Sequence, residues 1–166
     1  MSTPARVRAV PAAAVRPLRT SVLRPEWPAD RLLTFAEDGE PATAHVAARQ
    51  DGKVVGVGTV YPQPPPEGLR GDIPEGAYVP GASWQLRGMA TADGVRGTGV
   101  GAAVLDACVE AVRRGGGTHA WCNARIGAVG FYERAGWTVV GNPFVVAGVG
   151  PHVVMWRAVE APGQTG

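Results

Sequence analysis

A glycine-rich stretch that follows a predicted strand and opens a predicted helix constrains this chain more than any other feature. The strand is expected over Trp84–Ala90, the stretch reads Arg96-Gly97-Thr98-Gly99-Val100-Gly101, and the helix continues to about Arg114. The first amides of a helix lack partners within it, and the helix dipole is positive at that end. Because glycines let an anion approach the backbone and Arg96 adds a positive charge, the stretch predicts an anion site that suits a diphosphate.

The same glycines have three other interpretations. They could serve only a tight turn. A P-loop needs Gly-Lys followed by Ser or Thr, and the sequence lacks that pattern. Gly97, Gly99 and Ala102 formally satisfy the dinucleotide fingerprint G-x-G-x-x-[G/A]. That fingerprint also needs an acidic residue about 20 positions later, and residues 120–124 contain none.

Apolar spacing and chain-breaking residues predict the elements before the loop. Apolar residues at helical spacing predict a helix over residues 11–23, which should end before Pro25. Asp51-Gly52 tolerates the positive φ angles of a tight turn and predicts a hairpin. Residues 61–81 are rich in proline and glycine and predict a long loop without helix. The strands expected here are 6–10, 42–48 and 53–61.

After the loop, the sequence predicts strands over 118–123, 137–140 and 152–158, with a helix over 126–135. His119, at the start of one strand, is expected to be exposed. Hairpins and crossovers mixed in this order predict an α/β (α+β) fold. We expect a single mixed sheet, partly antiparallel and partly parallel, with helices on both faces.

Length and composition exclude several classes of protein. The 166 residues suit one domain, expected over 1–160, with a disordered tail over 161–166. A formal net charge of +2 is too weak to indicate nucleic acid or a membrane surface as a partner. No apolar run approaches the ~20 residues of a membrane span, and residues 1–10 lack a signal-peptide core, so we expect a cytoplasmic protein. Cys108 and Cys122 form no metal motif, and no metal is expected.

The loop resembles the acyl-CoA signature of the GNAT superfamily of N-acetyltransferases. That signature reads [Q/R]-x-x-G-x-[G/A], after a strand and at the start of a helix, and is here Arg96-x-x-Gly99-x-Gly101. Family members also carry an Asn near the end of a downstream strand, then a helix with Phe-Tyr, then glycine and an aromatic residue. Those features are here Asn123, Phe131-Tyr132 and Gly136-Trp137.

The resemblance covers about Arg6 to Ala158 and is strongest from Trp84 to Trp137. The chain is also similar to a bacterial subgroup of the family that has no agreed substrate. The shared features are Leu-Arg-x-x-Val-Leu-Arg-Pro over 18–25, Gly-Pro-His over 150–152 and Met155-Trp156.

The resemblance implies a place for acetyl-CoA. Two central parallel strands, 84–90 and 118–123, would splay apart, and the pantetheine arm would pair with the free edge of the first. A splayed pair is needed because the amides of the arm require backbone partners that a closed ladder would already use. The residues that the resemblance places at the cofactor are Leu86, Gly88, Met89, Ala90, Arg96, Gly97, Thr98, Gly99, Val100, Gly101, Ala102, Asn123 and Tyr132.

The resemblance also implies direct transfer of an acetyl group to an amine, without a covalent enzyme intermediate. Tyr132 matches the family's tyrosine and is the candidate general acid, with packing beside Phe131 as the structural alternative. His152 is a candidate general base, with a structural histidine as its alternative, and His45 is a second candidate. Asn123 would contact the cofactor or cap the following helix. Cys122 is expected to be a small core residue, not a nucleophile.

The acceptor is expected to be the amine of a small molecule or peptide, and the protein a monomer or homodimer. Three arginines could bind an acidic group on the acceptor, although solvated surface positions are their default. One histidine and one tryptophan could also line the acceptor pocket, the tryptophan having the core as its alternative. These candidates are Arg19, Arg24, Arg87, His45 and Trp84. A non-catalytic acyl-CoA-binding module or sensor, and a pure interaction domain, are the rival classes of function.

Overall fold

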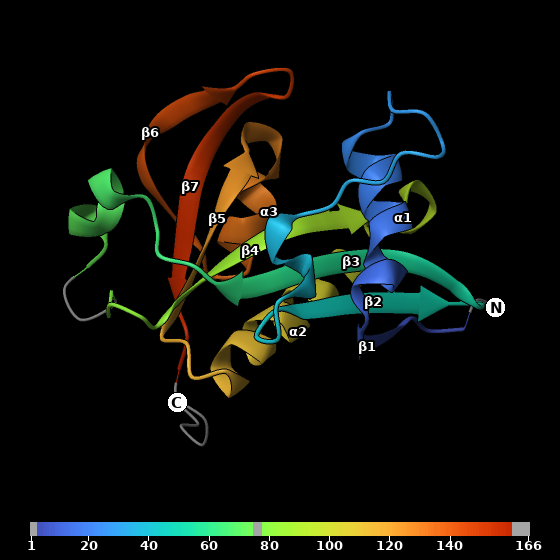
Figure 1. Ribbon diagram of the computed structural model, residues 1–166, viewed down its shortest axis with the longest axis horizontal. Helices are drawn as coiled ribbons and strands as arrows, with labels where there is room; N and C mark the ends of the chain where they lie inside the picture. Colours follow the sequence, from blue (N-terminus) through green and yellow to red (C-terminus); the bar gives the residue numbers. More distant parts are fainter. Residues whose placement is uncertain (1–2, 75–77, 161–166) are drawn as a thin grey trace. The chain divides into compact units, whose positions relative to one another are not determined.

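A computed structural model describes residues 3–74 and 78–160 of the chain (Figure 1). The α-helices and strands are β1 (Arg6–Val10), α1 (Ala12–Leu23), β2 (Ala44–Gln50), β3 (Lys53–Pro62), β4 (Ser83–Thr91), α2 (Val100–Arg114), β5 (His119–Arg125), α3 (Val129–Arg134), β6 (Thr138–Val146) and β7 (Gly150–Ala158). The short 3-10 helices are η1 (Ala36–Gly39), η2 (Glu67–Asp72), η3 (Asp93–Val95) and η4 (Ile126–Ala128). The tail predicted over 161–166 lies outside the described residues.

The strands form one mixed sheet of seven strands in the order β1-β2-β3-β4-β5-β7-β6. The pairs β1–β2, β2–β3, β5–β7 and β6–β7 are antiparallel, and β4–β5 is parallel. The parallel register joins Ser83–Gln85 to His119–Trp121 and extends no further within the described residues. This architecture confirms the predicted fold class, including a parallel pair that is joined at one end only.

The chain divides into two units, each with its own internal contacts. The first contains Met1–Tyr61 and Leu86–Ala111, and the second contains Pro62–Gln85 and Val112–Gly166. Strand β4 and helix α2 each contribute residues to both. The single domain expected over 1–160 stays a prediction.

In the first unit, helices cover both faces of the sheet formed by β1, β2 and β3, which lie side by side in Figure 1. On one face, Val15 of α1 belongs to a fully buried cluster with Val57 of β3. Gly56 and Gly58 flank Val57 and therefore face the other side. A Cβ added at Gly58 would lie 2.8 Å from Cys108 Sγ, so these glycines let α2 pack directly onto β3.

In the second unit, Trp84 at the start of β4 packs beside the glycines that follow α2. A Cβ added at Gly117 would lie 2.6 Å from Trp84 Cδ1, so the glycine makes room for the indole. Met155 of β7 is fully buried, and α3 brings Tyr132 against Trp137, the residue before β6. The core of this unit therefore joins β4, β5, β7 and α3.

Several predicted bounds are corrected by the structure. The strand expected to end at Val140 runs to Val146, because a register shift between Val140 and Phe144 lets β6 continue beside β7. The loop predicted over 61–81 contains η2, whose tight 3-10 turn begins after Pro66 and tolerates a proline at its start. The helix predicted over 126–135 is divided into η4 and the six-residue α3.

His119 was predicted to be exposed, and this prediction was wrong. Its side chain is fully buried, because β5 is a central strand with β4 and β7 on its two sides. The ring of Tyr78 contacts the imidazole edge-on, with 5.5 Å between the ring centroids. The predicted hairpin is confirmed, since Asp51 and Gly52 have φ angles of 51° and 77° between β2 and β3.

Candidate functional site

The glycine-rich loop joins η3 to α2 in the first unit. Gly97 and Gly99 have φ angles of 80° and 90°, a region that L side chains rarely adopt. The Thr98 hydroxyl donates to the Val95 carbonyl, and the Ala103 N–H donates to the Gly99 carbonyl at 3.0 Å. Among the described residues, apart from the glycine itself and its two chain neighbours, no heavy atom lies within 4 Å of a Cβ added at Gly97 or Gly99. The loop is therefore ordered by internal hydrogen bonds while the space over its glycines is open.

The groups in this loop that could hold an anion are backbone amides and one guanidinium. The N–H groups of Val100, Gly101 and Ala102 lie in the first turn of α2 and have no carbonyl partner within the helix. Arg96 Nη2 lies 3.2 Å from Asp93 Oδ1, and the two side chains are 61% and 92% exposed. An ion pair between side chains this exposed contributes little to stability. Arg96 is therefore able to exchange Asp93 for a stronger anion.

Strand β4 changes its geometry at Gly88, whose φ angle is 69°. A Cβ added there would lie 3.0 Å from Arg19 Nε and 3.0 Å from Phe35 Cε2. Because the register with β5 ends at Gln85, the groups of Leu86–Ala90 on that edge have no β5 partner within the described residues. These backbone groups could pair with an extended ligand, and their assignment to the pantetheine arm stays a prediction.

Tyr132 lies in α3 in the second unit and is 7% exposed. The rings of Phe131 and Trp137 contact it edge-on, with centroid distances of 5.1 and 5.5 Å. Its hydroxyl is hydrogen-bonded to the thiol of Cys122 on β5. The ring is thus fixed by packing while the hydroxyl has a polar partner, so the packing and the proposed acid role are compatible.

Cys122 is buried, at 2% exposure, as expected for a core residue. Burial raises the pKa of its thiol, and hydrogen bonds with the Met155 backbone and Tyr132 oppose that rise without cancelling it. Burial likewise raises the pKa of Cys108 to about 12. Because both thiols are protonated at neutral pH, neither is equipped to act as a nucleophile.

Asn123 is exposed near the end of β5, where its Cα is paired with Val154 of β7. The residue before η4 is Arg125 and the residue before α3 is Ala128, so Asn123 caps neither helix. The capping interpretation of Asn123 was therefore wrong. Its amide is left facing solvent on the same strand as Cys122.

His152 lies on β7 in the second unit and is 7% exposed. Its Nδ1 lies 2.8 Å from the Gly150 carbonyl oxygen, and its ring stacks on Phe144 with 5.9 Å between centroids. A carbonyl oxygen can only accept, so Nδ1 donates to it, and in the neutral form of the imidazole the lone pair would lie on Nε2. This tautomer is the one that a general base using Nε2 requires.

Arg19 and Asp38 form a buried ion pair in the first unit. Arg19 Nη1 lies 2.8 Å from Asp38 Oδ2 and Nη2 lies 3.1 Å from Oδ1, which makes the contact bidentate. Arg19 Nη2 also donates to Thr59 Oγ1 at 2.9 Å, and the Phe35 N–H donates to Asp38 Oδ2 at 3.1 Å. The predicted acceptor residue Arg19 is fully buried and engaged by these groups, so we do not assign it to the acceptor.

His45 belongs to the same buried network. Its Nε2 lies 3.0 Å from the Asp38 carbonyl oxygen, and its Nδ1 lies 2.9 Å from Thr59 Oγ1. Because the carbonyl can only accept, Nε2 carries the proton and Nδ1 accepts from Thr59. Both ring nitrogens are occupied, so His45 supports the network and has no free atom for the acceptor.

Arg87 is the predicted acceptor residue that the structure leaves exposed with an ordered guanidinium. Its Cζ lies 4.0 Å from the centroid of the Phe35 ring, and its side chain is hydrogen-bonded to Tyr61. Phe35 is 8% exposed and Tyr61 is 2% exposed, so both supports are buried. Neither support was identified from the sequence, because Phe35 and Tyr61 are far apart in the chain and belong to no motif.

Arg24 and Trp84 are the two remaining predicted acceptor residues. Arg24 Nη1 donates to the Leu23 carbonyl at 2.7 Å, and its Cζ lies 5.9 Å from the Trp27 ring beyond the end of α1. Trp84 is 6% exposed in the core of the second unit, as its alternative interpretation expected. We therefore do not assign Trp84 to the acceptor.

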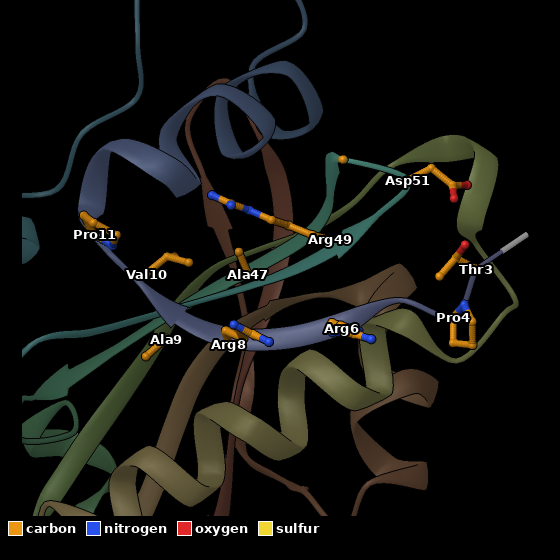
Figure 2. A pocket seen from close by; sticks show the side chains of 11 residues that line it. Thr3, Pro4, Arg6, Arg8, Ala9, Val10, Pro11, Ala47, Arg49 and Asp51 are labelled. Carbon is orange, nitrogen blue, oxygen red and sulfur yellow. The ribbon is translucent and has the colours of Figure 1, made fainter.

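A pocket of about 450 Å³ lies beside β1 in the first unit (Figure 2). Arg6 and Arg8 come from β1 and Arg49 from β2, and Asp51 from the hairpin turn also lines it. In the antiparallel register Arg6 is directly opposite Arg49. The pocket shares no lining residue with the glycine-rich loop.

Residues 3–74 and 78–160 contain no helix long and apolar enough to cross a membrane. In the same residues no group of three or more histidine, cysteine or acidic side chains is arranged to hold a metal ion.

Comparison with known proteins gives consistent results. Residues 12–137 match the acetyltransferase (GNAT) family. The Bacillus subtilis (strain 168) protein named "Uncharacterized N-acetyltransferase YitI" is 27% identical over 143 residues, which cover 86% of this chain and 89% of that protein. An acyl-CoA N-acyltransferase from Pseudomonas aeruginosa has a TM-score of 0.69 at 19% identity, over 93% of this chain and 100% of that one.

A further solved structure with the same fold is an aminoglycoside 6'-N-acetyltransferase complexed with coenzyme A. Its TM-score is 0.63 at 15% identity, over 96% of this chain and 99% of that one. At these identities the two solved structures show the fold that this chain shares.

Proposed function

Because this chain belongs to the acetyltransferase (GNAT) family, we propose that it is an N-acetyltransferase that moves an acetyl group directly from acetyl-CoA to an amine. The proposal assigns the cofactor's pyrophosphate to the loop Arg96–Gly101 and its pantetheine arm to Leu86–Ala90. It assigns proton transfer to Tyr132 and His152. In the same proposal the protein is cytoplasmic. It acts, as a monomer or homodimer, on the amine of a small molecule or peptide.

The observation that carries the proposal is the open loop at the start of α2. Gly97 and Gly99 have positive φ angles, which set the conformation of the loop backbone. No described side chain fills the space above the loop. The first amides of α2 and the helix dipole both favour an anion there. The donor set, with amides and one exchangeable guanidinium, fits a diphosphate.

Bound acetyl-CoA would supply an activated acetyl thioester. In the proposed reaction the unprotonated amine attacks the thioester carbonyl carbon, the new C–N bond forms, and the C–S bond breaks. His152 Nε2 takes a proton from the amine, directly or through water. The Tyr132 hydroxyl gives a proton to the departing thiolate, after which the tyrosine regains a proton from solvent and His152 releases its proton to solvent. The balance is one acetyl amide and one free thiol for each thioester consumed.

The alternative is a non-catalytic acyl-CoA-binding module or sensor on the same fold. It would keep the loop but would have no working pair of acid and base. The hydrogen bond that fixes the His152 tautomer favours the enzyme, because it leaves Nε2 as the basic atom.

The test is to incubate the protein with acetyl-CoA and a panel of amines, and to measure binding and free thiol side by side. The panel comprises amino acids, polyamines, aminoglycosides and peptide N-termini. The proposal expects binding together with thiol release that depends on an amine. Binding without release would favour the sensor, and absence of binding would favour a pure interaction domain.

A further inference from the structure

Arg87 precedes Gly88 on β4, in the first unit, and its orientation depends on that glycine. Ala90 packs in the buried cluster below α1, and in a regular strand Gly88 would share that face while Arg87 pointed to the other. Yet the Arg87 guanidinium lies 4.0 Å from the Phe35 ring, which is the ring that faces Gly88. The φ angle of 69° at Gly88 breaks the alternation, in the manner of a β-bulge, and turns Arg87 toward the α1 face.

Phe35 and Tyr61 hold the Arg87 guanidinium in place while Arg87 itself stays exposed. A guanidinium that lies over an aromatic ring keeps its N–H groups in its own plane, pointing away from the ring. Tyr61 occupies part of the five donors, so the others are available to a ligand. The side chain is thus pre-ordered for a planar, two-oxygen partner.

The charge of Arg87 is not balanced within the part of the chain that the structure describes. No carboxylate there lies within ion-pair distance of it, whereas Arg19, on the same Phe35 ring, is paired with Asp38 at 2.8 Å. Burial raises the pKa of Tyr61, Arg87 opposes that rise, and the charges of Glu37 and Asp38 add to it. The surroundings of Tyr61 therefore contain one unpaired cation and two carboxylates, of which Asp38 is already engaged.

We propose that Arg87 binds a carboxylate carried by the acceptor, so that the acceptor is an amine of the amino-acid type. This inference rests on the proposed acetyl transfer, because it concerns the second substrate of that reaction. Arg87 lies within the β4 segment assigned to pantetheine, which would bring the acceptor's amine to the thioester. The nearby carboxylates disfavour a doubly charged group, so a carboxylate suits the site better than a phosphate monoester. Glu37 would attract the acceptor's ammonium group.

The test compares matched acceptors that differ only in the acidic group. Amino acids are paired with the amines that remain after removal of the carboxylate, such as β-alanine with ethylamine, and phosphoethanolamine serves as the phosphate arm. We measure kcat/KM from thiol release at saturating acetyl-CoA. The wild-type protein is expected to prefer the carboxylate-bearing member of a pair by roughly 10- to 100-fold, as for a hydrogen-bonded charge.

Substitution of Arg87 should remove that preference. Arg87→Met is expected to lower kcat/KM for carboxylate-bearing acceptors by roughly 10- to 100-fold, mainly through KM, while the acid-free amines change little. Arg87→Lys keeps the charge without the planar fork and should fall between the two. The matched control is Arg8→Met, at an exposed arginine of β1 that the inference does not use. Arg87 is exposed, so both variants are expected to fold.

The outcomes separate the inference from the function on which it rests. Equal turnover of paired acceptors, a preference for the phosphate arm, or a preference that survives in Arg87→Met would each overturn the carboxylate assignment and leave acetyl transfer standing. Binding of acetyl-CoA with no turnover of any carboxylate-bearing acceptor would also overturn it. Failure to bind acetyl-CoA would overturn the proposed function first.

Discussion

Arg19 and Asp38 lie 2.8 Å apart in the interior of the first unit, with 0% and 2% of their side chains exposed. Asp38 also accepts hydrogen bonds from Arg16 Nε at 3.2 Å and from the Phe35 N–H at 3.1 Å. One carboxylate therefore joins α1 to the segment that carries Phe35, and Phe35 in turn supports Arg87. Stability and the proposed recognition of the acceptor by Arg87 would thus depend on the same network.

Asp38→Asn should destabilise the protein by about 3–5 kcal/mol, because it leaves the buried Arg19 charge without its partner. Asp30→Asn, at an exposed aspartate in the same connection, is the matched control and should change stability by less than about 0.5 kcal/mol. Urea unfolding of both variants measures the difference. If Asp38→Asn lowers the free energy of unfolding no more than the control does, the Arg19–Asp38 pair makes no net contribution to stability.

The Arg19–Asp38 pair should also make the stability of the protein depend on pH in the acid range. Burial opposes ionisation of Asp38, but hydrogen bonds from Arg19, Phe35 and Arg16 and the charge of Arg19 lower its pKa below the ordinary value of 3.8. A carboxylate whose pKa is lower in the folded state than in the unfolded state stabilises the protein at pH values above its unfolded-state pKa. That stabilisation is lost as the pH falls through the folded-state pKa. Thermal unfolding from pH 6 downward should therefore show a loss of stability below about pH 4 that is absent in Asp38→Asn. Parallel curves for the two proteins would contradict the assignment.

For the arginines beside β1 we predict a substitution that stabilises the protein, in contrast to the loss of stability expected for Asp38→Asn. Arg6 is directly opposite Arg49 across an antiparallel pair, and like charges in that position destabilise a sheet. Arg6→Thr should stabilise the protein by about 0.2–1 kcal/mol at low ionic strength, and the gain should shrink as salt screens the repulsion. Melting temperatures at two salt concentrations measure this. A loss of stability at low salt would mean that the arginines have attractive partners.

Much of the fold could be predicted from the sequence because its signals are local. The Asp51-Gly52 turn, the glycine loop and the apolar face of α2 each depend on neighbouring residues, and the structure confirms the turn and the sheet class. The extent of β6 beyond Val140 could not be predicted, because it depends on pairing with β7. His119 was misjudged for the same reason, since the burial of a strand depends on its neighbours in the sheet.

The site was predicted unevenly. The loop could be proposed as a site because an anion site at a helix start needs glycines close together in sequence, and its role stays a prediction. The candidate acceptor residues could not be ranked, because Arg19 and Arg87 look alike in the sequence. What separates them is a buried partner, Asp38, that only the tertiary structure brings to Arg19.

Tyr132→Phe tests the proposed acid while keeping the ring that packs on Trp137. A group that protonates the departing thiolate acts mainly in the transition state, so the variant should lower kcat and leave acetyl-CoA affinity unchanged. We expect a loss of roughly 100-fold or less, because a thiolate is a good leaving group and general acid catalysis spans about 10²–10⁴-fold. Single-turnover rates measure it, since slow product release would hide the effect. Tyr78→Phe, in the same unit, is the control, and an unchanged rate at position 132 would leave Tyr132 a packing residue.

Arg96 and Asp93 give a paired prediction on affinity. If Arg96 makes a charge-assisted contact with the pyrophosphate, Arg96→Ala should weaken acetyl-CoA binding by roughly 1.5–3 kcal/mol. Asp93→Asn should leave affinity equal or raise it slightly, because the exposed pair at 3.2 Å no longer competes for the guanidinium. Calorimetric titration measures both. An effect of Arg96→Ala below the lower figure would mean that the backbone amides dominate.

The central claim is that the loop at the start of α2 binds the cofactor's pyrophosphate, and Gly101→Glu tests it most directly. Gly101 is the second residue of α2, where a carboxylate favours the helix but would occupy the space of the phosphates. Ala13→Glu makes a similar change at the second residue of α1 and is the matched control. The measurement is the dissociation constant of acetyl-CoA for both variants, with melting temperatures to confirm folding. The account predicts no detectable binding by a folded Gly101→Glu protein and wild-type binding by Ala13→Glu, and wild-type binding by Gly101→Glu would contradict it.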